Sequence, residues 1–153
     1  MSREYALFDW EISNLTSSEN TPNEPGQADI SFPPKTADEF FQRGLKNAQL
    51  GIPDKAASDF EEAAWLEPDN HEIQFNLGVA YLSMADFEQA INNFTKAIEL
   101  KPGVADMYGN RAVAHAAIGE DEKSVSDEER AVNLGAPPDG LGSVIDYVKA
   151  QRK

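Results

Sequence analysis

The amino-acid sequence predicts an all-α protein in which pairs of helices stack side by side in one row. Three observations predict this fold class. From residue 37 onward, apolar residues recur at helical spacing, in blocks of about 12–14 residues separated by turn-forming residues. No sustained alternation of apolar and polar residues follows residue 36. The chain also matches itself at an offset of 34 residues, and a repeat of this length is typical of stacked helix pairs.

The blocks predict seven successive helices. The first begins after Thr36, because Thr36 and Glu39 have the spacing of a capping box, in which each side chain bonds a backbone N–H of the other residue. The second begins at Pro53, a residue that the first turn of a helix tolerates. Asp69 followed by Glu72 predicts a similar cap for the third. The predicted helices cover residues 37–50, 53–66, 71–84, 87–100, 105–118, 121–134 and 142–152.

The positions that recur every 34 residues explain how the helices pack. Each repeat is two helices, and one pair alone cannot bury both apolar faces, so stacked copies make one continuous core. Small residues let paired helices approach closely, Phe fills the remaining space, and Pro ends the second helix. The matching sets are Gly44, Gly78 and Ala112; Ala56, Ala90 and Ser124; Phe60 and Phe94; Ala63, Ala97 and Ala131; Leu66, Leu100 and Leu134; and Pro68 and Pro102.

This pattern resembles the tetratricopeptide repeat family, whose 34 residues carry an aromatic, Leu-Gly, Tyr, a small residue, an aromatic, Ala and Pro in that order. The repeat at 71–104 matches best, and only Gln74 stands where the leading aromatic is usual. The repeat at 37–70 has Arg43 and Asn47 in place of Leu and Tyr. The resemblance therefore covers about two thirds of the chain and is specific for the fold.

The last repeat, at 105–138, departs from the pattern in a way that indicates the end of the array. His115, Ser124 and Glu128 replace a Tyr, an Ala and an aromatic residue. Residues 139–153 then resemble the solvating helix that closes such arrays with a polar outer face. The resemblance implies a right-handed α-solenoid of three helix pairs with a C-terminal solvating helix. The predicted units are a tail at 1–36, the three repeats across 37–138 and the closing helix at 139–153.

The segment before the repeats is interpreted as a flexible tail, because Pro and Gly recur among polar residues from 16 to 36. A short apolar segment at 5–15 precedes that stretch and fits both a helical and a strand face, so its conformation stays open. This segment either packs on the folded part or forms a docking motif for a partner or for the protein's own groove. The docking motif would consist of Tyr5, Phe8, Trp10 and Ile12.

The charge of the chain excludes several classes of partner. The sequence contains 13 Lys and Arg residues against 27 Asp and Glu residues, which gives a formal net charge of −14. Such an acidic surface repels phosphate backbones and anionic lipid, so no nucleic-acid partner is expected. The sequence shows neither a secretory signal nor a run of roughly 18–20 apolar residues, so we expect a cytoplasmic protein without membrane insertion.

Catalytic and metal chemistry have few residues to draw on. The sequence has no Cys and two His, and it lacks a Gly-rich phosphate loop, a nucleophile elbow and a pair of His at metal spacing. We interpret His115 as a partly buried packing residue and the acidic runs, such as the one at Asp127, as solvated helix faces. No enzymatic activity, cofactor or metal is therefore expected.

The family resemblance implies that the first helix of each pair lines a concave groove. Carried over position by position, it predicts an acidic row, an amide row and an apolar floor. In the alternative interpretation, the polar residues only solvate this face and the Phe residues pack half-buried. The predicted groove residues are Asp38, Glu72 and Asp106 in the acidic row, Gln42, Asn76 and Asn110 in the amide row, and Phe41, Leu45, Phe75, Val79, Leu82 and Val113 in the floor.

The groove predicts a protein–protein interaction module: an adaptor, scaffold or assembly factor that binds a peptide or helix of a larger partner. An amide donates and accepts hydrogen bonds, so a row of amides can hold an extended peptide backbone. The acidic row favours a partner with basic residues beside its apolar ones. The alternative hypothesis is a self-assembling or self-plugged structural protein, in which the N-terminal segment occupies the groove.

One known role within the resembled family is not expected. Its co-chaperones hold the acidic tails of heat-shock chaperones with a clamp of Lys, Asn and Arg side chains. Of the five clamp positions in this sequence, only Asn76 agrees, and Asp106 stands in place of a Lys. The five positions are Phe41, Leu45, Asn76, Asp106 and Asn110. We therefore predict that acidic chaperone tails are not the partner.

Overall fold

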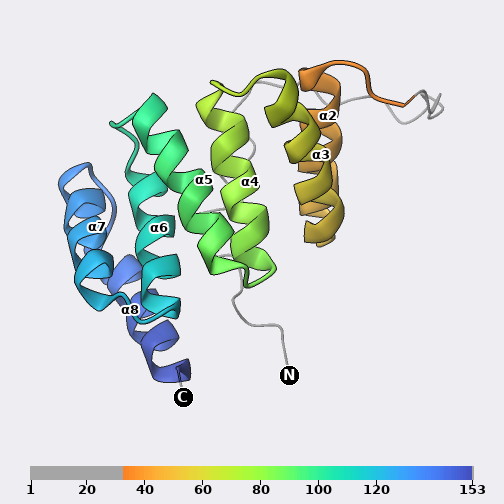
Figure 1. Cartoon of the computed structure of the whole chain (residues 1–153). Coiled ribbons are helices and arrows are strands. Elements are labelled where there is room, and N and C mark those ends of the chain that lie inside the picture. Colours follow the sequence, from red (N-terminus) through yellow and green to blue (C-terminus); the bar gives the residue numbers. More distant parts are fainter. Residues whose placement is uncertain (1–32, 153) are drawn as a thin grey trace.

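The computed structural model describes residues 33–152, and these form seven helices joined by short turns (Figure 1). The prediction of an all-α protein is confirmed for this part of the chain. The tail as far as residue 32, with the docking-motif residues Tyr5, Phe8, Trp10 and Ile12, lies outside the described residues. None of the described helices is long and apolar enough to cross a membrane. The helices are α2 (Ala37–Gln49), α3 (Pro53–Leu66), α4 (His71–Ser83), α5 (Phe87–Leu100), α6 (Ala105–Ala117), α7 (Asp121–Asn133) and α8 (Pro138–Gln151).

The helices form antiparallel pairs that follow one another in a row (Figure 1). The pairs are α2 with α3, α4 with α5, and α6 with α7, and the helices of each pair pack closely against each other. Each pair joins the next through its second helix, since α3 packs on α4 and α5 packs on α6. The closing helix α8 packs mainly on α6 and less on α7. This is the stacked arrangement that the 34-residue period predicts.

Two glycines set the close approach of the helices within the first two pairs. A Cβ built on Gly44 would lie 2.6 Å from the ring of Phe60, and one on Gly78 would lie 2.7 Å from the ring of Phe94. Both Phe rings are almost completely buried. Any larger residue at these positions would have to push the facing ring away, so the predicted role of the small residues is confirmed here.

The turn inside each pair uses the same left-handed backbone. Gly51, Ala85 and Gly119 directly follow the C-caps of α2, α4 and α6, and their φ angles are 71°, 60° and 84°. Glycine adopts this conformation at no steric cost, and it is common just after a helix. The middle repeat places an alanine there, although a side chain disfavours this region by about 1–2 kcal/mol.

Three predicted helix ends can be compared with the structure. The capping box of Thr36 and Glu39 at α2 is confirmed. The cap of α4 is Asn70, whose Oδ1 accepts from two backbone N–H groups, so the cap predicted at Asp69 is wrong. The closing helix starts at Pro138 rather than at residue 142. Proline favours the first helical position, and its effect outweighs the two glycines that follow it.

Candidate partner-binding groove

The acidic row predicted for the groove lies in the first turns of α2, α4 and α6. Asp38 and Glu72 are exposed, whereas Asp106 is half-buried. A carboxylate in the first turn interacts favourably with the helix dipole, so each of these residues also supports its own helix. The row places negative charge at the same position of every repeat.

The amide row divides into one exposed and two buried side chains. Gln42 is exposed, and its Nε2 lies 3.5 Å from Asp38 Oδ1. Asn76 and Asn110 are only 5% and 1% exposed. In both, Nδ2 donates to the backbone carbonyl four residues earlier, at 2.9 Å. This bond fixes each amide plane, and both Oδ1 atoms are buried without a hydrogen-bond partner.

The predicted apolar floor is mostly part of the core. Phe41, Val79 and Leu82 are 9%, 7% and 7% exposed. Leu45, Phe75 and Val113 are half-buried. The ring of Phe75 tilts by 48° against Phe94 at a centroid distance of 5.8 Å, and Phe41 stands in the same relation to Phe60. The half-buried residues therefore leave some apolar surface beside the buried amides.

Sequence reasoning missed two ion pairs that join the helices of the outer repeats. The Nε of Arg43 lies 3.0 Å from both carboxylate oxygens of Asp59. Arg111 donates to Asp127 from Nε and Nη2, with one bond of 2.7 Å to each carboxylate oxygen. Both carboxylates are buried, so the interpretation of the run at Asp127 as a solvated face is wrong for that residue.

The repeat itself contained the signal for these pairs. In both repeats the Arg and the Asp are 16 residues apart, and the second pair follows the first after exactly two repeat lengths. The middle repeat has Leu77 and Asn93 at these positions. The carboxylate hydrogen bond is the main reason that the pKa of Arg111 is raised above its ordinary value.

The residue at the usual Tyr position differs in each repeat and always reaches a carboxylate. Asn47 donates to Asp59 at 2.9 Å. The hydroxyl of Tyr81 donates to Glu61, and burial together with this bond raises the pKa of Tyr81 to about 12. In the third repeat, His115 Nδ1 lies 2.6 Å from Glu120. His115 was predicted to be a partly buried packing residue, whereas it is 6% exposed and belongs to a polar network.

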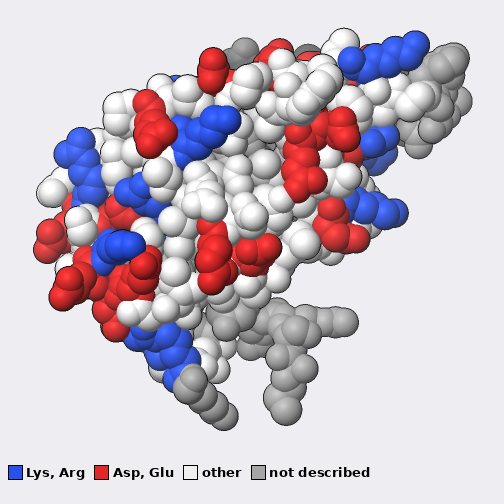
Figure 2. Space-filling view, viewed as in Figure 1, with Lys and Arg blue, Asp and Glu red and all other residues white. Residues whose placement is uncertain are grey.

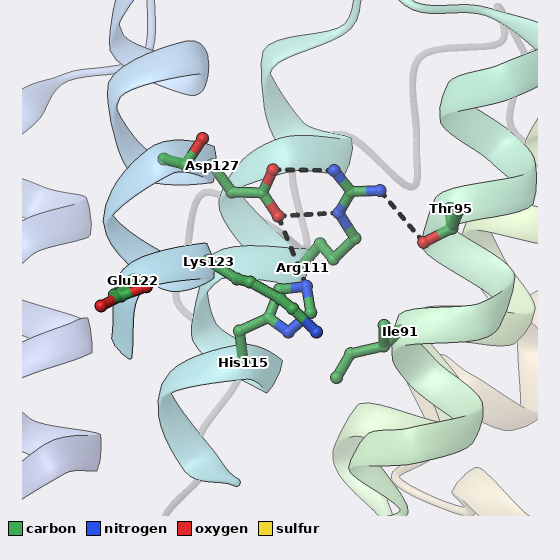
Figure 3. A pocket seen from close by; sticks show the side chains of 8 residues that line it. Ile91, Thr95, Arg111, His115, Glu122, Lys123 and Asp127 are labelled. Atoms are coloured by element: carbon green, nitrogen blue, oxygen red, sulfur yellow. Dashed lines mark hydrogen bonds and ion pairs between the residues drawn. The ribbon is translucent and has the colours of Figure 1, made fainter. Parts of the chain in front are cut away.

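A hollow of about 500 Å³ opens between α5, α6 and α7 (Figure 3). It is lined by side chains of both charges, by two hydroxyls and by one aliphatic group. Among the described residues, no three His, Asp or Glu side chains come together to hold a metal ion. The lining residues are Ile91, Thr95, Arg111, His115, Glu122, Lys123, Ser126 and Asp127.

The charged side chains of the face seen in Figure 2 are unevenly distributed. Acidic groups gather in several clusters, with basic groups between them and a broad uncharged area in the middle. The acidic character therefore belongs to the repeats themselves, as the position of most Asp and Glu residues after residue 36 predicts.

A family model of the tetratricopeptide repeat matches residues 71–104. This is the repeat with the best predicted pattern, and the neighbouring pairs have the same helix boundaries at the 34-residue offset, except that α7 ends one residue early at Asn133. Residues 71–104 are therefore a tetratricopeptide repeat. No curated protein sequence matches the chain.

Several solved structures share its fold. The Arabidopsis OM64 TPR domain aligns with a TM-score of 0.69 at 19% identity and covers 76% of this chain and 96% of that one. The first TPR of Spaghetti (RPAP3), bound to the HSP90 peptide SRMEEVD, gives 0.69 at 21% identity over 79% and 96%. YrrB, a TPR protein with an unusual peptide-binding site, gives 0.66 at 23% identity over 77% and 59%. These likenesses confirm the predicted α-solenoid.

Proposed function

We propose that this protein is a protein–protein interaction module that holds a peptide or helix of a partner against α2, α4 and α6. One observation carries the proposal: the Oδ1 atoms of Asn76 and Asn110 are buried and have no hydrogen-bond partner. An unsatisfied buried acceptor costs about 1–3 kcal/mol. Both oxygens are closed off in the free protein, so a partner N–H reaches them only when the side chains beside them shift, and each bond then formed would recover much of that cost.

The geometry of the two amides supports a role in backbone recognition. Each Nδ2 is held by its own helix, so each Oδ1 is oriented before any partner arrives. The two side chains occupy the same position in successive repeats, and the apolar surface of Phe75 lies on the same helix as Asn76. Pre-oriented groups lose little conformational entropy on binding.

The charge of this face favours a partner with basic residues. Asp38 and Glu72 are exposed in the first turns of α2 and α4, and the whole chain carries a net charge of −14. Such a field speeds the encounter with a cationic segment and slows that with an anionic one. The solved structures with a bound or named peptide site support peptide binding as the general mode.

The partner is not an acidic chaperone tail, and no catalytic role is proposed. At the five positions of the family's basic clamp, Phe41 and Leu45 offer no polar group, and Asp106 is itself acidic. Asn76 and Asn110 would have to hold a terminal carboxylate without any cation. The role that follows is that of a cytoplasmic adaptor, scaffold or assembly factor, which brings a basic, partly apolar segment of another protein to this face.

The test uses fluorescent peptides and variants of the amide row. An array of extended peptides that combine Lys with Leu or Phe is screened against the full chain, and the affinity of the best binder is measured by fluorescence anisotropy. Asn76→Ala and Asn110→Ala should each weaken binding by about three- to tenfold. Asn92→Ala, which alters an exposed Asn of α5, should have no effect.

The result is read together with circular dichroism, which should show unchanged helicity in all three variants. Equal affinities for the wild type, Asn76→Ala and Asn110→Ala would remove the amides from the binding face. If acidic peptides in the screen bind with the same affinity as basic ones, the proposed preference for a basic partner is wrong.

A further inference from the structure

The hollow between α5, α6 and α7 exists because the second junction between repeats is built from different side chains than the first. At the first junction the hydroxyl of Tyr81 reaches across from α4 to Glu61 on α3. One repeat later, His115 and Thr95 take the places of these two residues. Both replacements are shorter, so they leave a space of about 500 Å³ where the first junction is bridged.

The hollow also contains a cation that the first junction lacks. Arg111 stands at the position of Leu77, and its Nη1 donates to the hydroxyl of Thr95 at 3.0 Å. Figure 3 shows the guanidinium between Asp127 on α7 and Thr95 on α5, with His115 below it and Lys123 extending in front. Side chains from three helices therefore surround one small volume.

The hydrogen-bond donors in the hollow exceed the acceptors that use them. A guanidinium carries five N–H donors, and Arg111 uses three of them for Asp127 and Thr95. The ammonium of Lys123 carries three, and one of these goes to Glu120. The hydroxyls of Thr95 and Ser126 can each donate one more. These donors are open to an acceptor-rich ligand, which would replace water there.

The carboxylates of the hollow do not cancel this preference. Asp127 is engaged by two N–H groups of Arg111, and Glu120 is engaged by Lys123 and His115. Glu122 lines the hollow, but its side chain points away from Arg111 and His115 in Figure 3. Arg111 and Lys123 are neutralised by the same pairs, so the hollow offers a ligand free N–H donors at Lys123 and at the outer edge of Arg111 and no net positive charge.

We propose that this hollow is a receptor for a phosphate monoester. A phosphate group presents three terminal oxygens in a tetrahedral arrangement, whereas a carboxylate presents two in a plane. Donors that come from α5, α6 and α7 surround a tetrahedral group better than a planar one. Ile91 provides an apolar wall against which a short carbon chain next to the phosphate can pack.

The net charge of −14 limits the affinity of this site, since the long-range field of the chain opposes the approach of any anion. Binding in the millimolar range is therefore expected for inorganic phosphate. The site does not depend on the proposed peptide face, because it is formed by different side chains.

The test is a proton NMR titration of the full chain that uses its two histidines as reporters. His115 lines the hollow, while His71 lies at the start of α4 and serves as the internal reference. Phosphoserine is added at constant pH and ionic strength, with inorganic phosphate and succinate as separate arms. The expected result is a saturable shift of the His115 signal with both phosphate compounds, a much smaller shift with succinate, and no shift of His71.

Variants show whether the named donors hold the phosphate. Lys123→Gln and Thr95→Val should each weaken phosphoserine binding by about three- to tenfold. Lys101→Gln removes an exposed cation from the end of α5, outside the hollow, and should leave the affinity unchanged. The NMR spectrum of each variant also reports whether it is folded.

Two further arms identify the source of the phosphate. A short peptide with one phosphoserine is compared with free phosphoserine and with the unphosphorylated peptide. Tighter binding of the phosphopeptide would assign the site to a phosphorylated partner, and equal binding would assign it to a small metabolite. The proposal is overturned if the His115 signal does not saturate, if succinate binds as well as phosphoserine, or if Lys123→Gln has the same affinity as Lys101→Gln.

Discussion

Arg111 and Asp127 are joined by two hydrogen bonds of 2.7 Å across the third helix pair, and Asp127 is 6% exposed. The same two residue types face each other in the first pair, whereas the middle pair has Leu77 and Asn93. Equivalent positions in the three helix pairs therefore carry either a charged pair of residues or an uncharged one. Replacing a buried ion pair with uncharged residues is often neutral, but removing one partner is costly.

A substitution cycle at this pair should therefore be strongly non-additive. Arg111→Leu removes both hydrogen bonds of a buried carboxylate, which keeps only His115 Nε2 at 3.8 Å, and should lower the free energy of unfolding by about 3–5 kcal/mol. The double variant Arg111→Leu with Asp127→Asn copies the middle repeat and should recover most of that loss. Urea unfolding measures both values. If the two single changes simply add up, the pair is not coupled in the way its geometry indicates.

The glycines of the helices should respond in opposite ways to the same substitution. Gly78→Ala places a Cβ 2.7 Å from the Phe94 ring and should destabilise the fold by about 1–3 kcal/mol. Gly109→Ala is the matched control, because its Cβ would lie 3.6 Å from Leu141, an ordinary contact distance. Alanine also favours a helix interior over glycine by about 1 kcal/mol.

The midpoint of thermal unfolding, followed by circular dichroism, compares the two variants. Gly78→Ala should unfold at a lower temperature than the wild type, and Gly109→Ala at the same or a higher one. If both Gly78→Ala and Gly109→Ala lower the unfolding midpoint, the clash with the Phe94 ring is not the cause of the destabilisation.

Protonation of Asp121 should loosen the closing helix at acid pH. Arg152 in the C-cap of α8 bonds both oxygens of Asp121 at the start of α7, and this hydrogen bonding is the main reason that the pKa of Asp121 is lowered from its ordinary value. Because the folded-state pKa is lowered, the stabilisation is complete above the unfolded value and is lost as the pH falls through the folded one.

Hydrogen exchange of the α8 amides at decreasing pH measures this effect. In the wild type, the protection of the α8 amides should decrease once the pH drops below about 4, and this decrease should exceed any general loss of stability. In Asp121→Asn, the α8 amides should be less protected at neutral pH, and their protection should change less as the pH is lowered. Glu122→Gln, which alters an exposed neighbour on α7, is the control and should behave as the wild type. The same acid dependence in Asp121→Asn would assign the effect to other carboxylates.

The fold could be predicted almost completely because its cause is periodic. A 34-residue period fixes which residues recur on each face, and helix bounds such as Pro53–Leu66 and Phe87–Leu100 agree with the prediction at both ends. The start of α8 was missed since it lies after the last repeat, where no internal copy guides the assignment.

The candidate site was less predictable, because burial and pairing depend on neighbours that a single helix pattern does not specify. Asn76 and Gln42 occupy equivalent positions, yet one is buried and the other exposed, since α2 has no preceding pair among the described residues. In the sequence, Asp127 is part of an acidic run. Its burial depends on a hydrogen bond to Arg111, which lies 16 residues earlier on another helix. Both features required the packing of several helices.

The proposed partner charge can be separated from the missing clamp by varying the salt concentration. The chain should not bind the acidic peptide SRMEEVD, which is bound in the solved structure of the first TPR of Spaghetti (RPAP3). Two causes act together: the long-range repulsion of a chain with a net charge of −14, and Asp106 at a position where the clamp has a Lys. Salt screens the first cause, because the Debye length falls from about 10 Å at 0.1 M to about 3 Å at 1 M.

Salt cannot supply the cations that the clamp positions lack. Binding of SRMEEVD, measured by fluorescence anisotropy, should therefore stay undetectable at both low and high salt. A basic peptide from the array should bind more weakly as salt increases, since its attraction to Asp38 and Glu72 is screened. If the acidic peptide bound at high salt, repulsion alone would have kept it away, and the predicted exclusion of chaperone tails would then be limited to low ionic strength.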